Sequence, residues 1–255
     1  MELDALLFGT GSVVVWALCV CRGTWRSYWD RGLGYMMVLT AITLFLISPL
    51  STDTVGAILH TLTGRWGVDE YAGHMCAIGG TSGAVYHGVM RLEPPQYFAR
   101  KYERLVVHPV RLSMAALIML FWQSGATRRS HVHTLMEARP DFWLRGYWVL
   151  LCSVLIYMLG YGARAWLTLR HDPHSRVVAL FFFWGSVFAI VTCLVRIVNS
   201  VWIGSTVSGH PFIWTTGCLA TVLFSCGAGR SWAVRNRRIS RPGDDLIPDR
   251  PAPLQ

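Results

Sequence analysis

The chain has 255 residues, of which 53% are apolar and 15% are charged, whereas a soluble domain carries about 25% charged residues. Its formal net charge is +9, from 22 arginines and one lysine against 14 acidic residues. Such an excess would indicate nucleic-acid binding in a soluble protein, but here the arginines separate apolar runs, as topology signals in membrane proteins do. The composition therefore excludes an ordinary soluble domain and predicts an integral membrane protein that does not bind nucleic acid.

The chain begins without the pattern of a cleavable signal peptide. Residues 1–4 contain two acidic residues and no basic residue before the first apolar run, which is the reverse of the first segment of a signal peptide. We therefore expect the first apolar helix to be retained in the mature protein, with the N-terminus outside.

Seven apolar runs reach the length of about 17 residues that a membrane-crossing helix needs. In chain order they cover residues 5–21, 33–50, 72–90, 105–126, 147–169, 177–203 and 211–228. With the N-terminus outside, the inner side holds 16 arginines and lysines, counting Arg111 at the inner end of the fourth run, and the outer side holds 5, in agreement with the positive-inside rule. Omitting the fourth run, which His108, Pro109 and Arg111 interrupt, reduces this bias to 12 against 9. The sequence therefore predicts an all-α, polytopic transmembrane helical bundle of seven spans, with the C-terminus inside.

Segments between the runs are expected at the membrane surfaces. Residues 55–62 repeat apolar side chains at i, i+3, i+4 and i+7, which predicts a helix lying flat on the outer side. The basic loop after the third run is expected to contact anionic headgroups of the inner leaflet. Aromatic belts at the interfaces are expected from tryptophans near the span ends, among them Trp148, Trp166 and Trp214.

The chain divides into a transmembrane domain at 1–228 and a cytoplasmic extension at 229–255. The first half of this extension is basic and the second half is rich in proline and aspartate. We expect a juxtamembrane segment that contacts lipid headgroups, followed by a disordered tail. A protein partner could bind at this cytoplasmic face.

Two apolar runs carry polar side chains at helical spacing, and such stripes face the interior of a bundle because lipid offers them no partners. In the fifth run they are Tyr157, Tyr161, Arg164 and Thr168, and in the sixth run they are Thr192, Arg196 and Asn199. Arg164 lies near the inner end of its run, where its side chain can reach headgroup water. Arg196 lies about 10 Å below the outer surface, a depth at which an arginine is costly and indicates a ligand site or a structural partner.

The third run contributes His74 near its outer end, with Glu70 one turn earlier and Thr81 two turns later on the same face. A histidine at this depth can exchange a proton or simply bond a neighbouring carbonyl. We expect His74 and Tyr157 to be the polar partners of Arg196. A polar cavity is therefore predicted in the outer half of the bundle, lined by His74, Thr81, Tyr157, Thr192, Arg196 and Asn199.

Metal and cofactor chemistry finds no support in the sequence. The seven cysteines all lie in apolar runs, without the spacing of disulfides or thiolate sites, and we expect them to serve as small packing residues. The histidine pairs at 131 and 133 and at 171 and 174 lack a third ligand. No P-loop, dinucleotide-binding glycine pattern or paired carboxylates occur. We predict no metal and no cofactor.

Residues 79–86 read Gly-Gly-Thr-Ser-Gly-Ala-Val-Tyr and resemble the Gly-x-Ser-Gly signature of rhomboid intramembrane serine proteases. The resemblance implies Ser82 as the nucleophile and a histidine of a later span as its base, for which His210 is the candidate. The segment after His210 lacks the inner glycine of the family's histidine pattern, and three spans separate it from Ser82 where the family has one. A Gly/Ser/Thr cluster in a membrane helix is more often a close-packing surface. Protease activity is therefore the remote alternative, and we predict no catalytic residue.

The order of the runs resembles a group of uncharacterised actinobacterial membrane proteins. The resemblance covers roughly residues 5–228 and rests on Gly73-His74, on Tyr-Gly-Ala-Arg-Ala-Trp at 161–166, and on Arg196. It implies a seven-helix module in the plasma membrane, described in that group as a putative transporter or a domain of unknown function. Members usually continue into a soluble cytoplasmic region, whereas the present sequence extends about 27 residues beyond its last run. The arginine-rich composition also fits a GC-rich genome, which can be that of an actinobacterium or of a temperate phage that infects one.

The sequence leaves two functions open. The first is a sensory or interaction module, in which a small ligand in the outer-half cavity shifts helix packing and the inner basic segments report the change. The second is a small-solute transporter, for which broken helices near the bilayer midplane are characteristic. The prolines that interrupt apolar runs, Pro49 and Pro109, lie near the predicted interfaces, which favours the sensory module.

Overall fold

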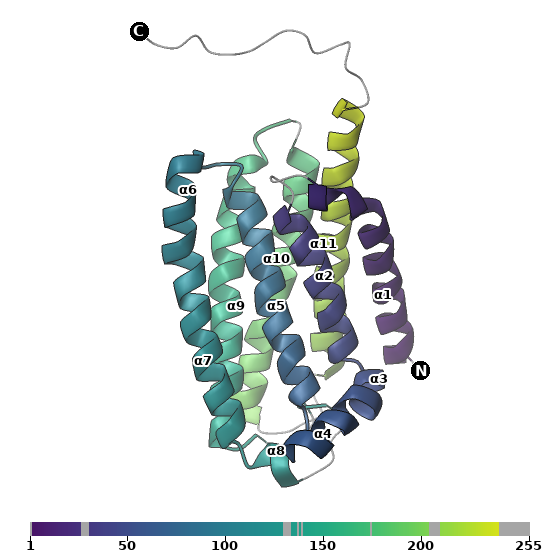
Figure 1. The fold of residues 1–255 in the computed structure, drawn as a ribbon, viewed down its shortest axis with the longest axis vertical. Coiled ribbons are helices and arrows are strands. Elements are labelled where there is room, and N and C mark those ends of the chain that lie inside the picture. Colours follow the sequence, from purple (N-terminus) through teal and green to yellow (C-terminus); the bar gives the residue numbers. More distant parts are fainter. Residues whose placement is uncertain are drawn as a thin grey trace.

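The computed structural model describes residues 2–26, 31–129, 134–136, 138, 140–173, 175–203 and 210–239. Within these ranges the regular structure is entirely helical and contains no strand (Figure 1). The all-α class predicted from the apolar runs is confirmed. The disordered tail expected after the last helix lies outside the described residues, as do His131, His133 and His174.

Long helices run side by side along the longest axis of the molecule (Figure 1). They are α1 (Glu2–Val20), α2 (Arg31–Leu46), α5 (Val68–Val89), α7 (His108–Gln123), α9 (Phe142–Leu169), α10 (Arg176–Val198) and α11 (His210–Ile239). The helix α6 (Pro95–Tyr102) joins α7 through the π-helical turn η4 (Glu103–Val107), and α10 continues into another π-helical turn, η5 (Asn199–Ile203). Because α11 continues to Ile239, part of the basic segment predicted after residue 228 is helical.

Five helical segments are long and apolar enough to cross a membrane, judged by length and composition. They are Ala5–Gly23, Gln96–Gln123, Phe142–Leu169, Arg176–Val201 and Pro211–Asn236. The pair Arg31–Leu46 and Pro49–Thr63 meets the same criteria together, but it bends by 66° at the break between its helices. These five or six segments are compatible with a membrane protein, and the count of seven spans stays a prediction.

The remaining long helix, α5, packs between α2 and α9. It is poorer in large apolar residues because glycines form the side that faces α2. A Cβ atom added to Gly83 would lie 2.7 Å from the carbonyl oxygen of Gly32, and one added to Gly80 would lie 3.5 Å from that of Met36. Small residues let two backbones approach in this way. The glycine-rich run at 79–83 is therefore a helix-packing surface.

Two apolar clusters form the core. The first joins α5, α7 and α9 around Tyr147, Trp148 and Phe121. The second joins α1, α2, α9, α10 and α11, with Trp166 of α9 and Phe182 of α10 stacked at a centroid distance of 4.4 Å. Trp148 and Trp166, which the sequence placed in interfacial belts, are thus almost completely buried inside the protein.

Short helices cover one end of the bundle, which we call the α4 end (bottom of Figure 1). After Leu46 the chain turns at Ser48, whose side chain caps α3 (Pro49–Ser51), and continues through η3 (Thr52–Gly56) into α4 (Ala57–Thr63). Ile58 and Leu62 of α4 are exposed. The amphipathic helix expected at 55–62 is therefore present, with apolar side chains facing away from the bundle, and its position on a membrane surface stays a prediction.

Candidate functional site

The predicted polar cavity divides into two separate groups of residues. Thr81 and Thr192 line a cavity between helices, whereas His74 and Arg196 surround Trp148. Asn199 is half-buried at the start of η5. The residues chosen from the sequence therefore do not form one site.

Tyr157 lies apart from both groups. Its side chain is exposed, and its hydroxyl donates a 2.8 Å hydrogen bond to the carbonyl of Leu105 in the π-helical turn η4. Arg164 and Thr168, which continue the same stripe, are exposed as well. The polar stripe of the fifth run was expected to face the bundle interior, but the structure turns most of it outward. A single reachable carbonyl on the neighbouring helix satisfies the Tyr157 hydroxyl there.

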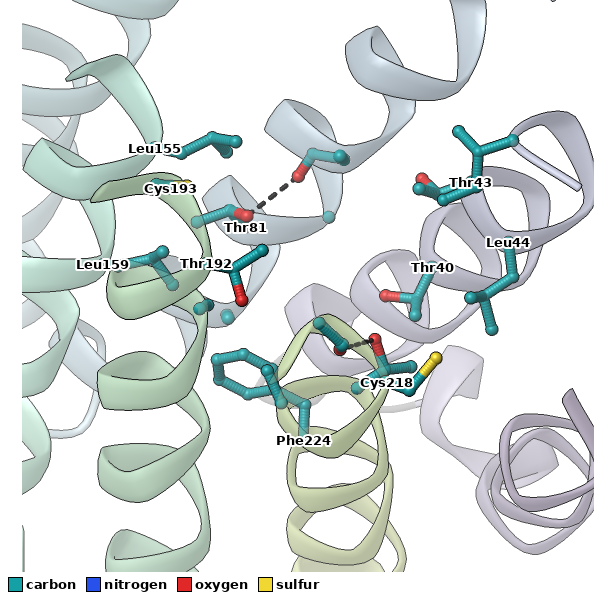
Figure 2. A pocket seen from close by; sticks show the side chains of 18 of the residues that line it. Thr40, Thr43, Leu44, Thr81, Leu155, Leu159, Thr192, Cys193, Cys218 and Phe224 are labelled. Atoms are coloured by element: carbon teal, nitrogen blue, oxygen red, sulfur yellow. Dashed lines mark hydrogen bonds between the residues drawn. The ribbon is translucent and has the colours of Figure 1, made fainter. Parts of the chain in front are cut away.

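The cavity has a volume of about 240 Å³ and lies between α2, α5, α9, α10 and α11. Figure 2 shows side chains of these helices around a common open space, with Leu155 and Leu159 on one side and Thr40 and Thr43 on the other. Its lining is mostly apolar. The polar lining includes Thr40, Thr43, Thr81, Thr192, Thr221 and Trp214.

Four lining threonines, Thr43, Thr81, Thr192 and Thr221, use their hydroxyl hydrogens within the protein. Thr81 bonds the carbonyl of Ala77 at 2.8 Å, and Thr43 bonds that of Leu39 at 2.8 Å. Thr192 lies 2.9 Å from the carbonyl of its own helix at Phe188 and 2.8 Å from the Thr216 hydroxyl of α11. Because a hydroxyl oxygen has two lone pairs, these groups offer weak acceptors to a molecule in the cavity.

Trp214 lines the cavity and carries an unpaired hydrogen-bond donor. Its side chain is 7% exposed, and its indole Nε1 has no hydrogen-bond partner among the described residues. A buried N–H group without an acceptor costs about 1 to 3 kcal/mol. The lining suits a mostly apolar molecule, and an acceptor on that molecule would pair this N–H if the Trp214 ring turned toward the cavity.

The second group of residues lies around Trp148, closer to the α4 end. The Cζ atom of Arg196 lies 3.8 Å from the centroid of the Trp148 ring. His74 approaches the same ring edge-on, with centroids 5.1 Å apart, and its Nδ1 lies 2.9 Å from the Tyr147 hydroxyl. Glu70, one turn from His74, accepts a 2.7 Å hydrogen bond from the backbone N–H of Leu135.

Arg196 is buried as its depth in the sequence indicated, but its main contact differs from the predicted ones. It is 8% exposed, and the described residues show it stacked on Trp148 rather than bonded to His74 or Tyr157. Trp148 and Trp214 were not predicted at the site because their positions near run ends placed both in interfacial belts. Most of the polar stripe in the fifth run faces outward, so it did not reveal which tryptophans point inward.

The protease alternative gains no support from the geometry of Ser82. Its Oγ lies 2.9 Å from the Ile78 carbonyl of its own helix and 3.6 Å from the sulfur of Met158. Among the described side chains, no histidine contacts this hydroxyl. His210 is the first residue of α11, and its side chain lies outside the description.

The described part of the chain holds no group of three or more His, Cys, Asp or Glu side chains that could bind a metal ion.

Comparison with known proteins gives no relative: no family model, curated protein or solved structure matches this chain.

Proposed function

We propose that the protein is a multi-pass plasma-membrane sensor that binds a small, mostly apolar molecule in the cavity between α2, α5, α9, α10 and α11. The observation that carries this proposal is an apolar cavity of about 240 Å³ that is lined in part by Trp214, whose buried indole N–H has no partner among the described residues. An apolar cavity of about 150 Å³ holds benzene, and drug-sized ligands need about 300 Å³ or more. The ligand is thus comparable in size to a substituted aromatic ring.

We further propose seven spans, with the N-terminus outside and the C-terminus in the cytoplasm. The distribution of 16 against 5 basic residues supports this orientation. With 22 residues, α5 is about 33 Å long and can cross a hydrocarbon core of about 30 Å while α2 and α9 cover it. The basic segments then lie on anionic headgroups at the cytoplasmic face, where a protein partner could also bind.

The cavity offers a route from ligand to response through α10 and α11. Thr192 lines the cavity and bonds Thr216 across these two helices at 2.8 Å, and α11 leads into the basic cytoplasmic segment. A ligand shifts a conformational equilibrium only when it binds one state more tightly than the other. In this proposal the occupied cavity stabilises one packing of α10 on α11, and the cytoplasmic segment reports it.

Thermal unfolding of the full chain in nanodiscs tests the binding site. A panel of small aromatic ketones and ethers should raise the melting temperature saturably, whereas aromatic hydrocarbons without an acceptor should raise it less. Trp214→Phe removes the N–H and should reduce this difference, while Trp143→Phe, at an exposed position of α9, should leave it unchanged. The cavity would be rejected as the binding site if no compound raised the melting temperature of the wild type. It would also be rejected if Trp214→Phe and Trp143→Phe showed the same difference between ligands with and without an acceptor.

A small-solute transporter is the second candidate, and one observation favours it. The helix pair that begins with α2 bends by 66°, and Ile47 at this break lines the cavity. Broken helices beside the substrate site are characteristic of transporters. Uptake of the stabilising compound into vesicles containing the protein separates the two functions. Saturable, protein-dependent accumulation of the compound in the vesicles would reject the sensor and support the transporter.

A further inference from the structure

Arg196 is a buried cation that makes no close ion pair among the described residues. Its side chain is 8% exposed, and no ion pair of Arg196 occurs within 4.0 Å among the residues that the structure describes. Removing a guanidinium from water is costly unless charge and hydrogen bonds compensate it. The Trp148 ring contacts only one face of the Arg196 guanidinium. The N–H groups of guanidinium lie in its plane, so stacking leaves them directed at other partners.

Two N–H donors in this contact have no acceptor. Neither the Nε of Arg196 nor the Nε1 of Trp148 has a hydrogen-bond partner among the described residues, although both atoms are inaccessible to solvent. Buried donors are almost always paired, and an unpaired one needs an explanation. Here the two belong to side chains of different helices, α10 and α9, that touch each other.

The neighbouring polar groups are engaged elsewhere. The Glu70 carboxylate accepts the N–H of Leu135 at 2.7 Å, and the Tyr147 hydroxyl lies 2.9 Å from His74 Nδ1. The charge of Glu70 is nevertheless close enough to act on Arg196. These groups form the surroundings of the two donors without bonding them, so the missing acceptor is not one of them.

We propose that Arg196 and Trp148 bind the carboxylate of a small organic acid, with the guanidinium supplying the charge and the indole a second N–H donor. A carboxylate brings a single negative charge to the guanidinium, which already lies within the electrostatic reach of the buried Glu70. A phosphate monoester carries about 1.5 to 2 negative charges at pH 7, and the nearby Glu70 opposes such an excess. This site is separate from the cavity, and its assignment does not depend on the function proposed for the cavity.

A lipid headgroup is the other source of a single negative charge, because a phosphodiester is also a monoanion. Arg196 faces the bundle interior rather than lipid, which favours a free acid. The two sources can be separated by measuring binding in nanodiscs of neutral phosphatidylcholine and in nanodiscs that also contain anionic phosphatidylglycerol.

Calorimetric titration of the full chain in phosphatidylcholine nanodiscs provides the test, with sodium hexanoate and sodium benzoate as probes. Their neutral amides, hexanamide and benzamide, are the matched control ligands, and inorganic phosphate is the competing anion. At least one acid should bind saturably, and its amide should not. Arg196→Gln should weaken this binding at least about tenfold, as loss of a charged hydrogen-bond donor does. Trp148→Phe should weaken it about fivefold by removing a neutral donor.

Two variants of exposed residues in α9 serve as controls. Arg164→Gln removes an arginine outside the site, and Trp143→Phe removes an indole N–H there, so both should bind the acid as the wild type does. Failure of both acids to bind the wild type, or unchanged binding to Arg196→Gln, would overturn the proposal. Binding only of phosphate, or displacement of the acid by phosphatidylglycerol, would overturn the carboxylate assignment. If Arg196→Gln does not fold, two results test the proposal instead. The wild type should bind the acid and not its amide, and Trp148→Phe should bind the acid more weakly than the wild type.

Discussion

Arg196 of α10 stacks on the indole of Trp148 of α9, with 3.8 Å between the guanidinium carbon and the ring centroid. A desolvated cation–π contact contributes about 2 kcal/mol. Burial of an ion costs several kcal/mol, so this contact offsets only part of the cost. The pair therefore holds a charge at a position where an apolar side chain would serve stability better.

The first prediction follows for Arg196→Leu. This change removes the charge together with its desolvation cost, so the variant should fold and unfold at the wild-type temperature or above it in detergent. Trp148→Leu should instead lower the free energy of unfolding by about 3 kcal/mol or more, because it removes a large buried ring and leaves the cation behind. Thermal unfolding followed by circular dichroism measures both. A lower melting temperature for Arg196→Leu would mean that the charge stabilises the fold.

The second prediction concerns Asp141, which precedes α9 and connects it to the ends of α7 and α8 (Ala126–Arg129). Its carboxylate accepts hydrogen bonds from the backbone N–H of Leu144 at 2.8 Å and of Gly125 at 2.7 Å, and from the Ser124 hydroxyl at 3.1 Å. Burial alone raises the pKa of Asp141, but these bonds outweigh burial and hold the pKa below its ordinary value. Asp141→Ala should therefore cost about 1 to 2 kcal/mol at neutral pH.

The sign of the pH dependence follows from the lowered pKa of Asp141. A carboxyl group with a lower pKa in the folded state stabilises the protein above its unfolded pKa, and this contribution disappears as pH falls through the folded value. The difference in unfolding temperature between wild type and Asp141→Ala should be constant above about pH 5 and shrink below about pH 4. Asp53→Ala, which changes an exposed carboxylate of η3, should alter stability little. A difference that persists unchanged at low pH would contradict this role of the charged carboxylate.

The helices could be predicted from the sequence because a chain in lipid must satisfy its backbone hydrogen bonds internally. The fifth run was predicted at 147–169, and the helix begins earlier, at Phe142, because the Asp141 cap adds a turn that apolar content does not reveal. The third run was recognised although its glycines lower its hydropathy. The bend after α2 was not expected, since it depends on the Ser48 cap and on the contacts that hold α3 and α4 across the end of the bundle.

The site could be predicted only in part. The depth of Arg196 correctly indicated a buried side chain, and Thr81 and Thr192 do line a cavity. Partner residues could not be predicted, because they depend on the rotations of helices whose few polar residues do not mark the buried face. Tyr157 shows the difficulty, since its hydroxyl is satisfied by the Leu105 carbonyl on the outside of the bundle.

The third prediction concerns the hydrogen bond between α10 and α11. Thr216 bonds Thr192 at 2.8 Å, whereas Thr215, its exposed neighbour, bonds only the Pro211 carbonyl of its own helix. Hydrogen bonds between membrane helices contribute about 0.6 kcal/mol on average. Thr216→Val should destabilise the protein by about this amount, and Thr215→Val should be neutral. A double-mutant cycle with Thr192→Val in detergent unfolding isolates the bond, and a coupling energy of zero would show that it does not hold α10 on α11.

The fourth prediction tests whether the run at 79–83 is a packing surface. A Cβ atom at Gly83 would lie 2.7 Å from the carbonyl oxygen of Gly32 and 3.1 Å from the backbone N of Met36. Backbone atoms cannot move aside as a flexible side chain can, so α2 and α5 must separate. Gly83→Ala should therefore cost about 1 to 3 kcal/mol.

Gly160→Ala is the matched control, because a Cβ atom at Gly160 of α9 meets nothing within 4 Å. Alanine is favoured over glycine by about 1 kcal/mol inside a helix, so this variant should be as stable as the wild type or more stable. Ser82→Ala provides a second comparison within the run itself. Its hydroxyl bonds the Ile78 carbonyl of the same helix, and its loss should leave both folding and ligand binding close to wild type. If Gly83→Ala were harmless while Ser82→Ala abolished cleavage of a transmembrane substrate, the run would be a catalytic element instead of a packing surface.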